Sequence, residues 1–286
     1  DSRSDCRRIL DTLAEQGFDS VQIPLPKAHL WSEETPYLYG IRASLLGADG
    51  SILDQAKDAF GVRLITWSPK GFFVNGKETL LRGGCIHHDN GVLGACTCDE
   101  SEMRRIRILK ANGYNAIRCA HNPCSKAILR ACDALGVYIM DETWDMWYSH
   151  KSKYDYATEF ISHYKEDLEA MVRRDYNHPS VVMYSIGNEV SEPASQKGVA
   201  LSQEMADYLR NLDETRAVTA GFNLMIIKSS AEGKGIYKEE GGRNDSNEAK
   251  AAGMSSTMFN MITSMVGTGM NKAANGKKAD EVTSPG

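Results

Sequence analysis

The sequence lacks any long apolar stretch and any excess of positive charge. No run of apolar residues approaches the roughly 20 residues that a membrane-spanning helix needs. Its 33 Lys and Arg residues face 38 Asp and Glu residues, which gives a formal net charge of −5. That balance argues against nucleic acid and against a membrane surface as partners. With 42% hydrophobic and 25% charged residues, the chain has the composition of a globular protein with a sizeable core.

Closely spaced cysteine pairs are missing as well. The seven cysteines are an odd number, lie scattered and form no Cys-x-x-Cys pair. This pattern favours reduced thiols and predicts a cytoplasmic protein. A zinc site that combines Cys96 and Cys98 with His87 and His88 is an alternative, although its spacing matches no structural zinc pattern.

The first residues, Asp1-Ser2-Arg3, include neither an initiator Met nor the apolar core of a signal peptide. We therefore expect the chain to be an internal piece of a longer protein. Its first 66 residues favour short strands, at 18–23, 37–46 and 60–66, with a hairpin signal at Asp49-Gly50. Strands and turns at this spacing predict part of a β-sandwich over residues 1–66.

From residue 67 the pattern changes to alternating strands and helices. An Asn75-Gly76 hairpin signal comes first. The strand candidates then lie before His87 and at 115–119, 137–140, 180–187 and 217–220, and the helices at about 99–112, 125–135, 162–174 and 197–212. This alternation indicates parallel strands with crossover helices, in a closed barrel or an open sheet. Further on, a Met-rich stretch at 258–266 has helical spacing and predicts a packing face.

Two motifs typical of an open nucleotide-binding sheet are absent. The sequence has neither Gly-x-Gly-x-x-Gly after the first strand nor a P-loop. Polar side chains instead follow the strands, as in the catalytic mouth of a barrel. They are His87-His88-Asp89, His121-Asn122, Asp141-Glu142 and Asn188-Glu189. We therefore expect the α/β class, with a (β/α)8 barrel of TIM type, incomplete in this chain, over residues 67–286.

Glu189 is the main candidate for chemistry. It follows the apolar run 180–187, and barrel enzymes place acid/base groups at the C-terminal ends of their strands. The neighbouring carboxamide of Asn188 can both donate to and accept from a sugar hydroxyl. Glu192 is expected to be solvated, because the chain turns toward Pro193.

Other side chains are expected around the same mouth. His87 and His121 follow successive strands and suit hydrogen bonding to a polar ligand. Arg118 inside a barrel needs a carboxylate partner. The carboxylates that compete for this role are Asp141, Glu142 and Asp145. Trp144 and Trp147 offer flat faces for stacking on sugar rings, or else simply cap the barrel.

Longer motifs run through the chain in a fixed order. They are Trp31-Ser32 with Pro36-Tyr37-Leu38-Tyr39, Phe60-Gly61-Val62-Arg63, Phe73-Val74-Asn75-Gly76-Lys77, Arg82-Gly83 with His87, Asn115-Ala116-Ile117-Arg118 with His121 and Pro123, Cys132-Asp133 with Gly136, Asp141-Glu142, Arg174-Asp175 with Asn177-His178-Pro179-Ser180-Val181, and Ser185 with Gly187-Asn188-Glu189. This series resembles glycoside hydrolase family 2, which contains β-galactosidases, β-glucuronidases and β-mannosidases. The first two motifs resemble the end of that family's immunoglobulin-like sandwich domain, and the others resemble its barrel.

The resemblance implies roles for individual residues. In that family the Glu of the Asn-Glu pair is the general acid/base, here Glu189, and the Asn, here Asn188, binds the sugar 2-hydroxyl. Histidines matching His87 and His121 line the sugar subsite. Retention of configuration needs a second Glu about 5–5.5 Å from the first. No carboxylate after the fifth strand candidate follows a buried strand, so we expect the nucleophile beyond residue 286.

The resemblance also bears on cofactors. Some family members bind Mg²⁺ through a Glu and a His after the third strand, where this chain reads Trp144-Asp145-Met146-Trp147. We therefore expect no cofactor and no metal. Asp145 and Trp147 are instead expected to contact the sugar, with Arg118 and Glu142 in support.

The sequence thus predicts a retaining hydrolase of terminal β-linked sugars, most similar to β-galactosidases. The expected partner is a carbohydrate, and the full-length protein is expected to form a homo-oligomer. One alternative is an inactive or sugar-binding fragment of such an enzyme. Others are a β-glucuronidase or β-mannosidase specificity, and a metal-dependent hydrolase built on His87, His88 and Asp89.

Overall fold

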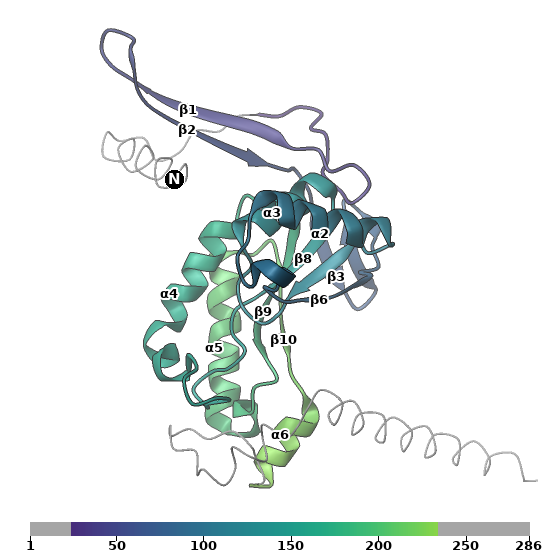
Figure 1. Ribbon diagram of the computed structural model, residues 1–286, viewed down its shortest axis with the longest axis vertical. Coiled ribbons are helices and arrows are strands. Elements are labelled where there is room, and N and C mark those ends of the chain that lie inside the picture. Colours follow the sequence, from purple (N-terminus) through teal and green to yellow (C-terminus); the bar gives the residue numbers. More distant parts are fainter. Residues whose placement is uncertain (1–23, 234–286) are drawn as a thin grey trace, which may run out of the picture.

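A parallel five-stranded sheet forms the centre of the computed structural model, which describes residues 24–233 (Figure 1). The spatial order of its strands is β10-β9-β8-β7-β6, so each strand lies beside its neighbour in sequence. The strands are β6 (Gly83–Ile86), β7 (Ala116–Cys119), β8 (Tyr138–Glu142), β9 (Val181–Asn188) and β10 (Ala217–Gly221). Because all five strands are parallel, their C-terminal ends meet at one edge.

Helices connect the successive strands. They are α2 (Asp99–Ala111), α3 (Lys126–Leu135), α4 (Ala157–Asp175) and α5 (Gln196–Leu212), with short 3₁₀ turns η1 (Gly91–Leu93) and η2 (Glu192–Ala194). Helix α6 (Leu224–Ala231) follows the last of these strands, β10. In Figure 1, α2 lies beside α3, and α4 lies beside α5. No helix within residues 24–233 is long and apolar enough to cross a membrane.

Local sequence signals set the ends of α3. The Ser125 hydroxyl accepts a hydrogen bond from Ile128 N at 3.2 Å, which caps the first turn. Gly136 ends the helix in the left-handed region with φ = 71°, where glycine carries no Cβ penalty. Both ends of this helix match the prediction. By contrast, α4 begins at Ala157, earlier than the periodicity predicts.

The core lies between the sheet and the helices. Ile139 on β8 and Tyr184 on β9 are fully buried, together with Leu129, Met205 and Leu209 from the helices. Strands of a parallel sheet are covered on both faces, so they read as continuous apolar runs rather than alternating ones. This is why the run 180–187 pointed to a buried strand.

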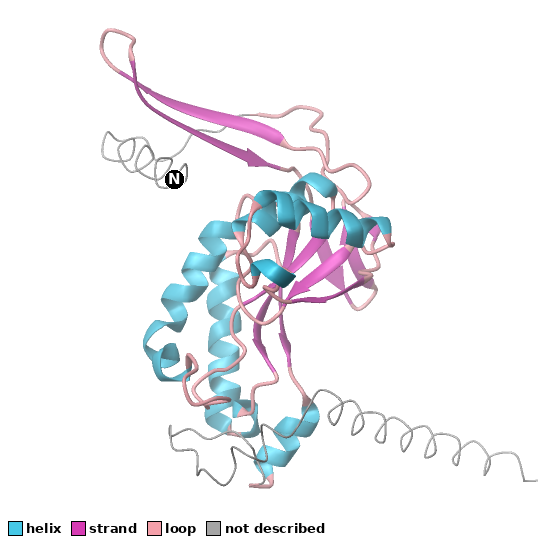
Figure 2. Ribbon diagram, viewed as in Figure 1, coloured by secondary structure: helices cyan, strands magenta, loops and turns pink. Residues whose placement is uncertain are grey.

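Two small antiparallel sheets precede the parallel sheet (Figure 2). One is the hairpin of β1 (Tyr39–Leu46) and β2 (Ile52–Phe60), and the other contains β3 (Ile65–Ser68), β4 (Gly71–Val74) and β5 (Lys77–Glu78). The β4–β5 turn has positive φ at Asn75 (53°) and Gly76 (79°), as a type I′ turn requires.

The predicted strand at 60–66 is wrong, because two strands meet there. Phe60 ends β2, and Ile65 begins β3. Between them the chain presses against the segment before β9: a Cβ on Gly61 would lie 2.6 Å from Pro179 Cγ. Arg63 donates to Pro179 O and to Val181 O, each at 2.7 Å, instead of extending a strand. The strand expected at 18–23 and the Met-rich stretch at 258–266 lie outside the described residues.

Candidate active site

The backbone turns sharply at Glu189, directly after β9. Glu189 has φ = 46°, in the left-handed region that non-glycine residues seldom adopt. Its N–H donates to Gly221 O at 2.8 Å, at the end of β10. One carboxylate oxygen, Oε1, accepts a hydrogen bond from Asn223 Nδ2 at 3.0 Å. Glu189 is half-buried, so its carboxylate is fixed by the protein yet reachable by a ligand.

Asn188 is held by three neighbours. Its Oδ1 accepts from Arg118 Nη2 at 2.9 Å, and its Nδ2 donates to Asp145 Oδ1 at 2.8 Å. Its main-chain carbonyl accepts from Lys151 Nζ at 2.8 Å, and the same ammonium lies 2.8 Å from Asp145 Oδ1. The contacts to opposite ends of the carboxamide fix which end is oxygen and which is nitrogen.

Glu142 is the carboxylate that pairs with Arg118. It is fully buried, and its Oε2 lies 2.6 Å from Arg118 Nη2 and 2.6 Å from the Ser185 hydroxyl. Its Oε1 lies 2.7 Å from His121 Nδ1. Burial opposes ionisation, but the hydrogen bonds from His121, Ser185 and Arg118 outweigh it and hold the pKa of Glu142 below its ordinary value. Of its two rivals, Asp141 pairs with Arg174, and Asp145 pairs with Lys151.

The ionised Glu142 sets the role of His121. Because Nδ1 faces a carboxylate, Nδ1 carries the proton in the neutral ring and Nε2 is left as the acceptor. The ring of His87 meets the ring of His121 edge to face, with centroids 5.3 Å apart. The two histidines thus lie together at the ends of β6 and β7, as the sequence predicted.

A pocket of about 860 Å³ opens beside these residues. Its lining includes His87, His121 and Asp145, and also Trp144 and Tyr156. Asn188 and Glu189 are not part of that lining. Asp145 connects the two regions, because it lies on the pocket wall and bonds Asn188. The pocket therefore lies next to the Asn188–Glu189 turn, on the side of Asp145.

Trp147 does not face this pocket. Its side chain is fully buried, and its indole N–H donates to Ile186 O at 2.8 Å. The ring stacks on Phe160 of α4 and leaves no face open to a sugar. This corrects the prediction that Trp147 contacts substrate. The ring instead supports the strand end before Glu189, where a Cβ on Gly187 would lie 2.7 Å from its Nε1.

Sequence reasoning missed three polar residues of this region. Lys151 and Asn223 come from loops without a motif. Lys151 contacts Asn188, and Asn223 contacts Glu189. Glu192 was expected in solvent but is only 4% exposed, and its Oε1 accepts from Ser149 N at 2.8 Å. Burial raises the pKa of Glu192, since an apolar surrounding disfavours the charged form.

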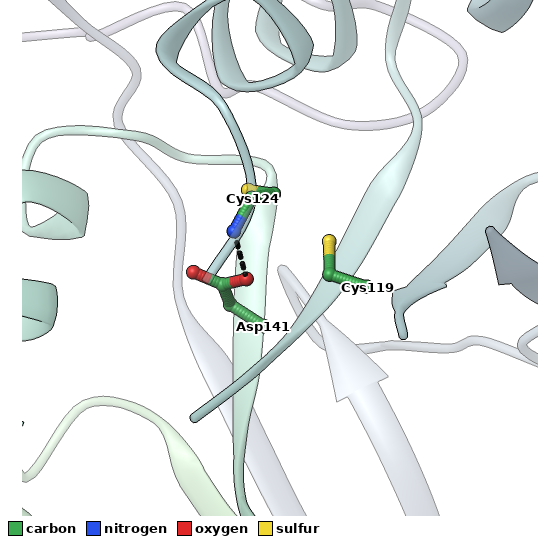
Figure 3. Close-up of side chains that lie close together, drawn as sticks. All are labelled: Cys119, Cys124 and Asp141. Carbon is green, nitrogen blue, oxygen red and sulfur yellow. Dashed lines mark hydrogen bonds between the residues drawn. The ribbon is translucent and has the colours of Figure 1, made fainter. Parts of the chain in front are cut away.

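One group of side chains has metal-ligating chemistry within residues 24–233: Cys119, Cys124 and Asp141 (Figure 3). All three are buried, and Asp141 already accepts from Cys124 N and pairs with Arg174. A hydrogen bond from Cys124 favours the thiolate of Cys119, but burial and the charge of Asp141 outweigh it and raise the pKa of Cys119 to about 12. Burial also raises the pKa of Cys124 well above its usual range. The three side chains are packed within the core, and the carboxylate of Asp141 is already bonded to Cys124 N and Arg174.

The Mg²⁺ site of some family members does not fit the residues after β8. The indoles of Trp144 and Trp147 offer no metal ligand, and the Asp145 carboxylate lies against the ammonium of Lys151.

Comparison with known proteins gives a consistent result. Residues 65–263 match the model of the glycosyl hydrolases family 2 TIM barrel domain, and residues 5–63 match that of glycosyl hydrolases family 2. The chain is 35% identical to Beta-galactosidase BoGH2A of Bacteroides ovatus, over 73% of this chain and 29% of that protein. It is 34% identical to a putative beta-glucuronidase of Formosa agariphila, over 71% of this chain and 19% of that protein.

Solved structures agree with these matches. A glycosyl hydrolase family 2 member from Bacteroides cellulosilyticus is 48% identical, with a TM-score of 0.65 over 68% of this chain and 25% of that one. A beta-glycosidase from Bacteroides vulgatus is 36% identical, with a TM-score of 0.63. The chain thus spans less than a third of the length of each of these relatives. The predicted fold class, a partial barrel preceded by part of a sandwich, is confirmed, and the chain belongs to glycosyl hydrolase family 2.

Proposed function

We propose that the protein hydrolyses terminal β-linked sugars with retention of configuration, and that Glu189 is its general acid/base. One observation carries this proposal: the Glu189 carboxylate stands at the C-terminal end of β9, next to a carboxamide held at both ends. Acid/base groups of barrel enzymes occupy this position. The family membership of the chain supports the same reaction class.

The proposed reaction has two steps. In the first step, Glu189 protonates the glycosidic oxygen while a second carboxylate attacks the anomeric carbon from the opposite face. In the second step, the ionised Glu189 removes a proton from water, which displaces that carboxylate. Within the described site, Glu142 and Asp145 are already paired with Arg118 and Lys151. We therefore assign the nucleophile to a carboxylate outside residues 24–233.

Asn188 and the histidines bind the sugar in this proposal. The Asn188 carboxamide lies next to the acid/base group and presents its edge to the 2-hydroxyl. Nε2 of His121 accepts a hydrogen bond from a sugar hydroxyl, because Nδ1 is committed to Glu142. His87, at the end of the neighbouring strand, contacts the same ring.

The charges of the site favour a neutral sugar over a uronic acid. Arg118 is paired with Glu142, and Lys151 with Asp145, so these cations are not presented to a substrate carboxylate. These four groups carry no net charge, so they offer an anionic sugar no attraction. A β-galactoside is therefore our first choice of substrate, and the name of the Bacteroides ovatus relative supports it. A β-glucuronide is the second, in line with the Formosa agariphila relative.

Chromogenic glycosides test the proposal. The chain, and the longest natural protein that contains it, are assayed with nitrophenyl β-galactoside, β-glucuronide and β-mannoside. We expect turnover of the β-galactoside by the long protein, and a fall of roughly a thousandfold in Glu189→Gln. Glu214→Gln, an exposed carboxylate outside the site, is the matched control and keeps full activity.

Two results would count against the proposal. Unchanged turnover in Glu189→Gln would remove the acid/base assignment. Sugar binding without any turnover, in the long protein as well, would favour the sugar-binding alternative.

The cysteines support a cytoplasmic location. Cys119, Cys124 and Cys132 are buried and unbridged, which suits a reducing compartment. Thiol counting on protein that is denatured in acid directly from cells checks this, and a reproducible disulfide would contradict it.

A further inference from the structure

We infer that Asn223 is a positioning residue for the acid/base carboxylate, an inference that rests on the proposed function. Asn223 precedes α6, and its Oδ1 accepts from Met225 N at 3.0 Å and from Ile226 N at 3.5 Å. Its Nδ2 donates to Glu189 Oε1 at 3.0 Å. Because the oxygen of this carboxamide caps α6, the orientation of the carboxamide is fixed, and its nitrogen points toward Glu189.

The same connection also holds the main chain of Glu189. Gly221 pairs with Asn188 in the β9–β10 ladder, and its carbonyl accepts from Glu189 N at 2.8 Å. A Cβ on Gly221 would lie 2.4 Å from Arg118 Nη2, so a side chain at this strand end would displace the guanidinium. Residues 221–223 therefore contact Glu189 twice, once at its backbone and once at its carboxylate.

This contact distinguishes the two carboxylate oxygens. A hydrogen bond donated to Oε1 favours an unprotonated Oε1, so the transferable proton is carried on Oε2. Asn223 thus orients the acid, and Oε2 is the oxygen that gives its proton to the leaving group. The carboxamide of Asn223 is committed to Glu189 and to the first turn of α6, so its effect passes through Glu189.

The quality of the leaving group separates this role from a structural one. A poor leaving group such as an alkoxide needs the proton as its bond breaks, whereas a dinitrophenolate leaves without it. Loss of orientation at Glu189 should therefore affect kcat/KM for alkyl glycosides much more than for dinitrophenyl glycosides. A general loss of folding would lower both equally.

The test uses Asn223→Ser and Asn223→Asp in the longest natural protein that contains this sequence. Both replacements are good helix caps, but Ser is too short to reach Glu189 and Asp has no N–H to donate. We expect kcat/KM for a methyl β-galactoside to fall about tenfold or more. For the dinitrophenyl β-galactoside it should change less than about twofold, with the thermal midpoint preserved. Asn112→Ser, in the exposed turn after α2, is the control.

Each outcome decides between the claims. If both substrates lose activity equally, or if neither does, Asn223 does not position the acid and the inference is wrong. If the unchanged protein hydrolyses neither these β-galactosides nor the matching β-glucuronides, the proposed function fails, and the inference fails with it. If the unchanged protein is active and both variants keep its ratio of kcat/KM for the methyl to the dinitrophenyl β-galactoside, the inference is refuted and the proposed function stands.

Discussion

Arg118 on β7 and Glu142 on β8 form an ion pair, with Nη2 2.6 Å from Oε2, and the same Nη2 lies 2.9 Å from Asn188 Oδ1. Three neighbouring strands therefore meet in one hydrogen-bonded chain. The orientation of Asn188, and with it the turn at Glu189, depends on a charge pair that touches no substrate. Under the proposed function, this arrangement makes the ion pair a support of the acid/base turn as well as of stability.

Replacing Arg118 should separate these two roles. In Arg118→Lys the ammonium still pairs with Glu142 but loses the contact to Asn188, because the lysine side chain ends one bond short of the position of Nη2, which bonds both residues. We expect kcat/KM to fall about tenfold or more, with little change in the urea midpoint. In Arg118→Met the buried Glu142 loses its partner, at a cost of about 2–4 kcal/mol in the free energy of unfolding. Wild-type kcat/KM in the Lys variant would contradict this account.

Glu142 should make the protein sensitive to acid. Its folded-state pKa lies below the ordinary value of 4.5, so its contribution to stability is complete above that value. The contribution is lost as the pH falls through the lowered folded-state pKa. The difference in urea midpoint between wild type and Glu142→Gln should therefore be large at pH 7 and shrink toward pH 3. The exposed Glu214→Gln should show no such trend, and a constant difference for Glu142→Gln would argue against this explanation.

Glu192 should behave in the opposite way. Burial raises its folded-state pKa, so stability is present below the ordinary value and is lost as the pH rises through the raised one. Glu192→Gln keeps an oxygen to accept from Ser149 N and removes the buried charge. We expect a higher thermal midpoint than wild type at pH 7, and equal midpoints near pH 4. A lower midpoint at pH 7 would mean that the charge itself is needed.

Local signals predicted much of the fold. Ser125 and Gly136 predicted the ends of a helix, and Asn75-Gly76 predicted a hairpin turn. Each of these signals depends only on residues close to it in sequence. The apolar runs predicted parallel strands, and the polar residues after them predicted which edge carries the site. The position of Glu189 at the C-terminal end of a buried parallel strand could therefore be predicted from sequence alone.

Long-range contacts account for what was missed. Asn223 reaches Glu189 across 34 positions in sequence, and Lys151 reaches the Asn188 carbonyl across 37, so no spacing pattern revealed either one. Trp147 was misread for the same reason. Its flat indole face indicated a sugar platform or a cap of the barrel, but the stacking partner that buries it, Phe160, lies on the next helix. Composition near a strand end therefore predicts a site, whereas tertiary packing decides which side chains face it.

Asp145 should control the preference for a neutral sugar. Its carboxylate lies 2.8 Å from Lys151 Nζ, and it is 38% exposed on the wall of the pocket. Asp145→Asn keeps a carbonyl oxygen and an amide for the local hydrogen bonds but removes the negative charge that faces Lys151. The charge of Lys151 is then uncompensated and attracts a substrate carboxylate. The ratio of kcat/KM for β-glucuronide to that for β-galactoside should rise about threefold to tenfold, with a larger rise at low salt. Adding Lys151→Met to the same protein should cancel the rise. A ratio that stays constant in Asp145→Asn, or that rises equally in the double variant, would show that these charges do not set the preference.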